Sequence, residues 1–320
     1  VALHRAGLDL DIALATTTAS DLPEEVLGVP VDRGLAWPVN GLADDGTLDA
    51  LRAAGARAVV LSAASFPPSP EVTYTPSGSI DLAGGGSPLR AALADPTVSR
   101  LVAAPRKAVE PSQVDAVVRR QTAIATIAMT TLELPTTARS LVVAPDLWWR
   151  VDSTMTRDLV ATLDSPWSVP QPLAELLASP ASDVPRARVD YPASAQAAEL
   201  SPSYLAAVQA ARADLAALRS VAPDDGTSAT AGLETALTRA ESGAWRRDRV
   251  GGRELLASVT TTIDDETGAV QVLSRAPVSL PGESGVIPVT VANDLDRPAR
   301  VGLRLTGTPR VRFEADDVEP

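Results

Sequence analysis

The sequence predicts a mixed α/β protein in three parts: an incomplete (β/α) barrel-like domain of six to seven strands, a helical bundle, and an immunoglobulin-like β-sandwich segment. Apolar runs alternate with helical segments over residues 1–193, which is typical of parallel strands covered by helices. Apolar residues then recur at three- and four-residue steps over residues 194–264, and at alternate residues over 265–320. We therefore expect three domains with these boundaries. We expect the last to be truncated, because a whole immunoglobulin-type sandwich takes about 100 residues.

The first predicted elements of the barrel-like domain are two short strands, at residues 8–14 and 34–39. The second strand runs into a turn at Asn40-Gly41, a residue pair that tolerates left-handed backbone angles. A turn of this kind directly after a strand brings the chain around toward the next element.

A helix and a buried strand follow this turn. The helix is expected over residues 45–55, with Thr47 or Asp45 accepting its free N-terminal amides and Gly55 taking a left-handed exit. The strand covers residues 57–62 and is apolar throughout, which favours a parallel strand covered on both faces. Strand, helix and strand together predict one βαβ unit.

The rest of the domain repeats the alternation. Ser87-Pro88 has the residue types of a helix start. Helices are expected at residues 87–94, 112–129, 155–163 and 172–177, and strands at residues 98–103 and 140–145. A closed eight-fold barrel usually needs about 250 residues, so the shorter first domain predicts an incomplete barrel.

The bundle and the sandwich are distinguished by the spacing of their apolar residues. One helical face is formed by Leu205, Val208, Ala211, Leu215 and Leu218. Further helices are expected at residues 230–240 and 246–262, a turn at 264–268, and antiparallel strands at 270–273, 285–291 and 300–305.

Composition excludes several kinds of chemistry. The net charge of −12 disfavours nucleic acid as a partner, because phosphate backbones are bound by basic surfaces. The chain has no cysteine, and His4 is its only histidine. A Ser-His-Asp triad on this frayed N-terminal residue and a zinc site built from several imidazoles are therefore both disfavoured. We expect no metal and no cofactor.

The ends and the hydropathy of the chain also lead to expectations. It starts at Val1 without the segments of a signal peptide and stops at Pro320, so we interpret it as a piece of a longer protein. No run approaches the ~20 apolar residues that span a bilayer. We expect no membrane contact by this piece.

Carboxylates and indoles remain as the candidate functional groups. Asp146 directly follows the strand predicted at residues 140–145, where side chains reach the mouth of an α/β domain. Trp148 and Trp149 lie beside it in sequence, and Trp37 and Asn40 end an earlier strand. Indole faces stack on the C–H surfaces of sugars, so this group predicts a carbohydrate cleft. The alternative is that the indoles cover the end of the barrel and Asp146 caps a turn.

Catalysis would need a second acid beside Asp146, because glycoside cleavage uses one protonated and one charged carboxyl group. Glu133 is the partner that we consider, although it could simply end a helix. Other features favour structural roles: Gly84-Gly85-Gly86-Ser87 lacks a phosphate-binding lysine, and Asp264-Asp265-Glu266 lacks calcium-loop spacing.

Five segments of the chain form a recognisable set: residues 34–38 (GLAWP), 59–62 (VVLS), 139–145 (RSLVVAP), 165–167 (SPW) and 280–293 (LPGESGVIPVTVAN). Together they resemble a poorly characterised family of exported actinobacterial envelope proteins, encoded beside the flippase for the peptidoglycan lipid precursor. The resemblance implies an extracytoplasmic location and a C-terminal membrane anchor in the full-length protein. These are packing and turn motifs, so no catalytic residue is implied.

The order of the three parts is also similar to that of alpha-mannosidases and amylopullulanase-type glycoside hydrolases, whose barrel is shared in outline with polysaccharide deacetylases. The metal ligands of the deacetylases cannot be matched with one histidine. This resemblance implies either a carboxylate-only enzyme or a barrel without chemistry.

Three functions follow as hypotheses. The first is a non-catalytic envelope protein that binds cell-wall glycan or envelope proteins. The alternative is a glycoside hydrolase-like enzyme acting on a polysaccharide through Asp146 and a second acid. The third is a scaffold for the cell-wall synthesis machinery.

Overall fold

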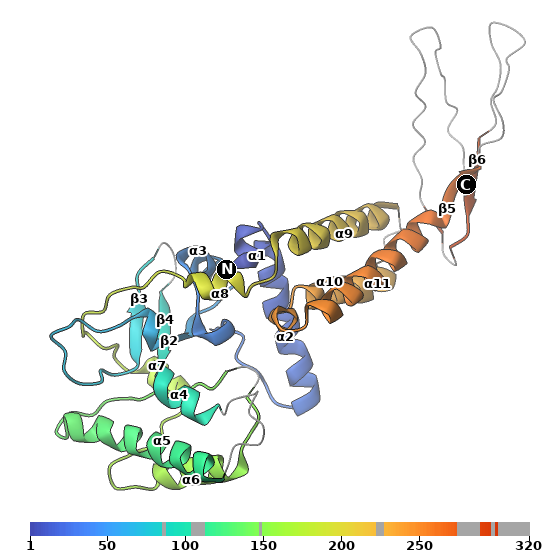
Figure 1. The fold of residues 1–320 in the computed structure, drawn as a ribbon. Coiled ribbons are helices and arrows are strands. Elements are labelled where there is room, and N and C mark those ends of the chain that lie inside the picture. Colours follow the sequence, from blue (N-terminus) through green and yellow to red (C-terminus); the bar gives the residue numbers. More distant parts are fainter. Residues whose placement is uncertain are drawn as a thin grey trace, which may run out of the picture. The chain divides into compact units, whose positions relative to one another are not determined.

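The computed structural model describes residues 1–84, 88–103, 113–146, 149–221, 227–273, 289–295 and 298–299 (Figure 1). The chain divides into two compact units, Val1–Pro202 and Ser203–Pro320. Each unit is described by itself.

The first unit is built on a four-stranded mixed sheet with the strand order β1-β2-β4-β3. β1 (Leu35–Ala36), β2 (Ala58–Ser62) and β4 (Leu89–Ala94) are parallel, and β3 (Ser79–Leu82) pairs antiparallel with β4. The carboxyl ends of the three parallel strands therefore meet at one edge of the sheet. The mixed α/β class predicted from the sequence is confirmed.

The βαβ unit is present, with α3 (Asp45–Ala53) connecting β1 to β2. The helix cap differs from the prediction: the carboxylate of Asp44 accepts the backbone N–H of Thr47, and the Thr47 hydroxyl donates to the same oxygen. Gly55 leaves the helix at φ 92°, as its position predicts. The preceding aspartate is the better cap because its ionised oxygen also complements the positive end of the helix dipole.

Three of the predicted elements are wrong in type. Residues 8–14 fall in α2 (Asp9–Leu27), residues 89–94 form β4 instead of a helix, and residues 98–102 belong to α4 (Pro96–Val102) instead of a strand. Short apolar runs do not distinguish strand from helix by periodicity.

The context decides the type of β4 and α4. β4 is paired on both sides, so its small apolar side chains fill both faces of the sheet. α4 is started by Asp95, whose carboxylate accepts the N–H groups of Thr97 and Val98, with Pro96 at its first position. Asp95 and Pro96 were placed between a predicted helix and a predicted strand, and so were not recognised as the start of a helix.

The described strands do not close into a barrel. The strand predicted at residues 140–145 is reduced to one parallel bridge between Ala94 and Val142. The described part of this unit therefore has four strands where six or seven were predicted. The remaining α-helices in the described part of this unit are α1 (Ala2–Arg5), α5 (Gln113–Glu133), α6 (Ser153–Leu163), α7 (Leu173–Ala178) and α8 (Ala193–Ala197).

Both faces of the sheet are covered. Leu61 and Leu93 belong to a buried cluster on one face, and Val60 and Ala94 pack with Leu176 of α7 on the other. This burial fixes the register of β2 and β4, because a shift by one residue would exchange the two faces.

The second unit contains α9 (Pro202–Val221), α10 (Thr227–Ala240) and α11 (Arg249–Gly268). The five apolar positions predicted as one helical face, from Leu205 to Leu218, are all buried. The turn predicted at 264–268 is the last turn of α11. No helix in the described ranges is both long and apolar enough to cross a membrane.

A two-stranded antiparallel pair follows α11, formed by β5 (Val270–Leu273) and β6 (Thr290–Asn293). The strand predicted at 300–305 and most of the one at 285–291 lie outside the described residues. The immunoglobulin-like sandwich therefore stays a prediction, as do the three domain boundaries.

Candidate functional site

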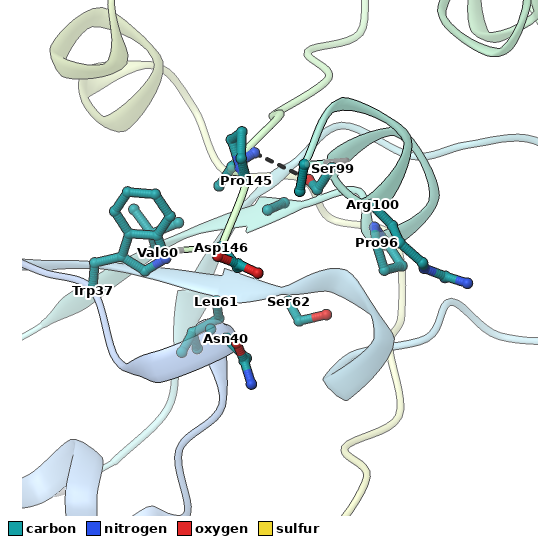
Figure 2. A pocket seen from close by; sticks show the side chains of 14 residues that line it. Trp37, Asn40, Val60, Leu61, Ser62, Pro96, Ser99, Arg100, Pro145 and Asp146 are labelled. Carbon is teal, nitrogen blue, oxygen red and sulfur yellow. Dashed lines mark hydrogen bonds between the residues drawn. The ribbon is translucent and has the colours of Figure 1, made fainter. Parts of the chain in front are cut away.

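A cavity of about 270 Å³ lies at the carboxyl-terminal edge of the parallel strands (Figure 2). Its lining comes from the loop after β1, the end of β2, the end of β4 with α4, and the segment before residue 147. The residues are Trp37, Asn40, Gly41, Val60, Leu61, Ser62, Ala94, Pro96, Ser99, Arg100, Ala103, Ala144, Pro145 and Asp146. Open α/β sheets bind their ligands at this edge.

The loop after β1 is held tightly against the end of β2. Asn40 has φ 57°, the only positive φ of a non-glycine residue in the described ranges, and Gly41 has φ 65°. A Cβ atom on Gly41 would lie 2.5 Å from the backbone nitrogen of Ser62 and 2.9 Å from the carbonyl carbon of Leu61. Glycine is therefore required at position 41 for both its backbone angle and its small size. This contact positions Asn40 at the cavity.

The opposite wall is fixed by two hydrogen bonds that backbone N–H groups donate. The N–H of Asp95 donates to the carbonyl of Val142 (2.8 Å), and the N–H of Ala144 donates to the hydroxyl of Ser99 on α4 (3.0 Å). These bonds bring Pro145 and Asp146 over the ends of the strands.

The cavity combines an indole with a small number of polar groups. Trp37 is 41% exposed, so its ring is available to a ligand. Figure 2 shows the Asp146 carboxylate between Trp37 on one side and Ser62 and Arg100 on the other. Asp146 is the only carboxylate and Arg100 the only cation among the described residues of this lining. An apolar wall with a few convergent polar groups is typical of sites for small ligands.

The structure thus brings together three of the five predicted ligand-binding residues: Trp37, Asn40 and Asp146. Trp148 lies outside the described residues. Trp149 is absent from the cavity lining, and packs against the buried cluster around Met155.

Glu133 does not line the cavity. Its carboxylate accepts the backbone N–H of Thr75 (2.7 Å) and pairs with Arg139 (3.2 Å). Burial acts to raise the pKa of Glu133, but the hydrogen bonds from Thr75 and Arg139 outweigh it and hold the pKa below its usual value. This arrangement favours a structural carboxylate over a proton donor.

Three polar lining residues were missed by the sequence reading: Ser62, Ser99 and Arg100. Ser62 ends an apolar strand, and its position could have indicated it. Ser99 and Arg100 were not predicted because residues 98–103 were interpreted as a strand. In the structure both residues lie on α4 and line the cavity.

The other reactive groups are elsewhere or absent from the described ranges. His4 lies in α1, where its Nδ1 contacts the Oδ1 of Asp9 at 2.7 Å. No group of three or more histidine, aspartate or glutamate side chains within the described residues is arranged to hold a metal ion.

Comparison with known proteins gives a family. The family profile described as "Family of unknown function (DUF6049)" matches residues 3–316. No curated protein matches the chain.

Among solved structures, a 4-alpha-glucanotransferase from Thermococcus litoralis is similar over 79% of this chain, with a TM-score of 0.46 and 10% sequence identity. The chain spans 44% of that enzyme's length. A likeness at this level establishes neither a shared fold nor a shared activity.

Proposed function

The chain belongs to the DUF6049 family, whose function is unknown, and we propose that its first unit is a non-catalytic module that binds a sugar group of the cell envelope. The cavity beside Trp37 is the proposed site. The observation that carries the proposal is the placement of an exposed indole at the same cavity as one carboxylate, one amide and two serine hydroxyls, at the edge of the sheet.

This combination suits a sugar because a sugar ring has two kinds of surface. The axial C–H groups on one face are apolar and pack on an aromatic ring, whose face carries negative charge. The equatorial hydroxyls are donors and acceptors, which Asp146, Asn40 and Ser62 can bind at the ring edge. An ionised carboxylate accepts from two neighbouring hydroxyls and makes the stronger kind of hydrogen bond.

The size of the cavity limits the ligand. Its volume of about 270 Å³ is just below the ~300–1,000 Å³ of pockets that enclose drug-sized molecules. One sugar ring therefore fits, with the rest of a longer glycan lying outside. The exposed Arg100 at the rim adds a site for an acidic substituent.

Binding is favoured over hydrolysis by the number of carboxylates. Retaining and inverting glycosidases hold two carboxyl groups about 5–5.5 Å or about 6.5–9.5 Å apart. The described lining offers Asp146 alone, and Glu133 is already bound to Thr75 and Arg139. A carboxylate-only hydrolase remains the alternative hypothesis.

Calorimetric titration tests the proposal. Soluble cell-wall fragments and oligomers of N-acetylglucosamine are titrated into the wild type, Trp37→Ala, Trp37→Phe and Asp146→Asn. We expect at least a tenfold loss of affinity in Trp37→Ala, partial recovery in Trp37→Phe because a ring face is kept, and a loss in Asp146→Asn. The matched control is Asp183→Asn, which removes the same charge from an exposed residue outside the lining.

Two results would contradict binding without catalysis. Equal affinity of the wild type and Trp37→Ala for the sugar would show that the indole of Trp37 does not contact the ligand. Release of reducing ends from the fragments, abolished in Asp146→Asn, would support the hydrolase alternative instead.

We also propose that the protein acts outside the cytoplasm and is anchored to the membrane in its full-length form. The resemblance of segments such as residues 34–38 and 280–293 to exported envelope proteins supports this proposal. A fusion of the full-length protein to a reporter that is active only outside the cytoplasm tests it, and an inactive reporter would contradict it. Recovery of cell-wall synthesis enzymes with the protein, unaffected by Trp37→Ala, would favour the scaffold hypothesis.

A further inference from the structure

A second cavity, of about 200 Å³, lies at the same end of β4. Successive residues of a strand point to opposite faces of a sheet. Ala94 and Pro96 line the cavity beside Trp37, whereas Leu93 and Asp95 line the second one. The two cavities are thus separate sites on either side of one chain segment. The remaining lining residues of the second are Ala63, Pro68, Tyr74, Thr75, Pro76, Gly78, Ser140, Leu141, Val142 and Arg186.

Arg186 brings a positive charge into this cavity. Its Nη1 donates to the carbonyl of Phe66 (2.8 Å) and its Nη2 to the carbonyl of Ser77 (3.2 Å). Within the described residues, no carboxylate lies within 4.0 Å of the guanidinium. Burial lowers the pKa of Arg186, which reflects the cost of removing this charge from water. A partly buried guanidinium without a counter-ion gains from an anionic ligand.

Asp95 brings a negative charge into the same cavity. Its Oδ1 accepts the N–H groups of Thr97 (2.9 Å) and Val98 (2.7 Å), which leaves Oδ2 available for another donor. Asp95 and Arg186 both line the cavity but do not form an ion pair with each other. A ligand with only a negative charge would therefore be repelled by Asp95, and a ligand with only a positive charge would be repelled by Arg186.

We propose that the second cavity binds a small aliphatic α-amino acid, whose carboxylate pairs with Arg186 and whose ammonium group pairs with Asp95. A zwitterion satisfies both charges at once, which neither single-charge ligand does. Leu93, Leu141 and Val142 supply an apolar surface for a short side chain. The volume of about 200 Å³ suits a ligand of the size of alanine or valine.

This site is independent of the sugar site, because the two linings have no residue in common. Failure of one proposal therefore leaves the other standing, and titrating each ligand in the presence of the other separates them.

The test uses ligands that differ by one charged group. L-alanine, D-alanine and L-valine are titrated by calorimetry, beside propionate, which lacks the ammonium group of alanine, and ethylamine, which lacks its carboxylate. We expect at least one of the amino acids to bind, and both single-charge ligands to bind at least tenfold more weakly.

Asp95→Asn is the most informative variant. Asparagine caps a helix as well as aspartate does, so α4 is retained while the charge is removed. We expect the affinity for the amino acid to fall at least tenfold and that for propionate to stay the same or rise. Asp214→Asn, an exposed position in the second unit, is the control for net charge. Arg186→Lys keeps the positive charge but lacks the two Nη groups of the guanidinium. It should lower the affinity for both the amino acid and propionate.

The proposal is overturned if no amino acid binds the wild type at millimolar concentration. It is also overturned if Asp95→Asn binds the amino acid as tightly as the wild type does, or if propionate binds the wild type as well as alanine does.

Discussion

Replacement of Gly41 by alanine tests whether the loop carrying Trp37 and Asn40 is held by a close backbone contact. An alanine at φ 65° has left-handed backbone angles, which cost about 1–2 kcal/mol for a residue with a Cβ. The new Cβ would also lie 2.5 Å from the nitrogen of Ser62, a backbone atom that cannot rotate away. Overpacking of this kind adds about 1–3 kcal/mol. We therefore expect Gly41→Ala to lower the free energy of unfolding by about 2–5 kcal/mol.

Gly28→Ala is the matched control. Gly28 has φ 66°, almost the same angle as Gly41, but a Cβ there would meet no atom within 4 Å. The control variant should therefore lose about 1–2 kcal/mol from the backbone angle alone. The difference between the two variants isolates the contact with β2.

Urea unfolding followed by tryptophan fluorescence measures both variants. Four of the five tryptophans fall in residues 1–202, so the signal reports mainly on the first unit. Gly41→Ala should also lose sugar affinity, because its loop must move away from β2. Equal losses of stability in the two variants would refute the close approach, and with it our account of how the cavity wall is positioned.

Three further predictions concern stability. Asp44→Ala removes the cap of α3 and its bond to Thr47, and should cost about 1 kcal/mol in urea unfolding; an unchanged midpoint would contradict this role. Glu133→Gln should destabilise the protein at neutral pH by removing the partner of Arg139. Because the pKa of Glu133 is lowered in the folded state, its charge stabilises the protein above the unfolded pKa of about 4.3, and this contribution is lost as the pH falls through the folded pKa. The free energies of unfolding of wild type and variant should therefore converge in acid. A difference in stability that stays constant with pH would contradict this. Leu237→Ala, at a fully buried position of the second unit, should cost about 2–5 kcal/mol in thermal unfolding followed by circular dichroism, and a loss below 1 kcal/mol would indicate loose packing.

The sequence predicts the elements whose pattern is long or bounded by clear signals. The helical face from Leu205 to Leu218 is such a case, because five apolar residues at regular spacing leave one interpretation. The unit from β1 to β2 is another, since a glycine exit and a fully apolar strand bound its helix.

The errors arise where a short apolar run was interpreted without its partners. The alanine-rich β4 has high intrinsic helix propensity, and only its pairing with β2 and β3 makes it a strand. That error displaced α4, and so Arg100 was not recognised as a cavity residue.

The predicted site residues that line the cavity are those that follow a strand-like segment in the sequence. Trp37, Asn40 and Asp146 follow strand-like segments, and the parallel pairing places them at one edge of the sheet. Trp149 is only three residues from Asp146, yet it packs against the buried cluster around Met155. Closeness in sequence to Asp146 therefore did not place Trp149 at the cavity.

The most direct test of the sugar site is nuclear magnetic resonance of the indole N–H groups. Five tryptophans give five indole signals, which single Trp→Phe substitutions assign. On addition of an N-acetylglucosamine oligomer, we predict that the Trp37 signal and the side-chain amide of Asn40 shift together and saturate at one ligand per chain. Shifts confined to another tryptophan, or an unchanged Trp37 signal at saturating ligand, would contradict the central claim.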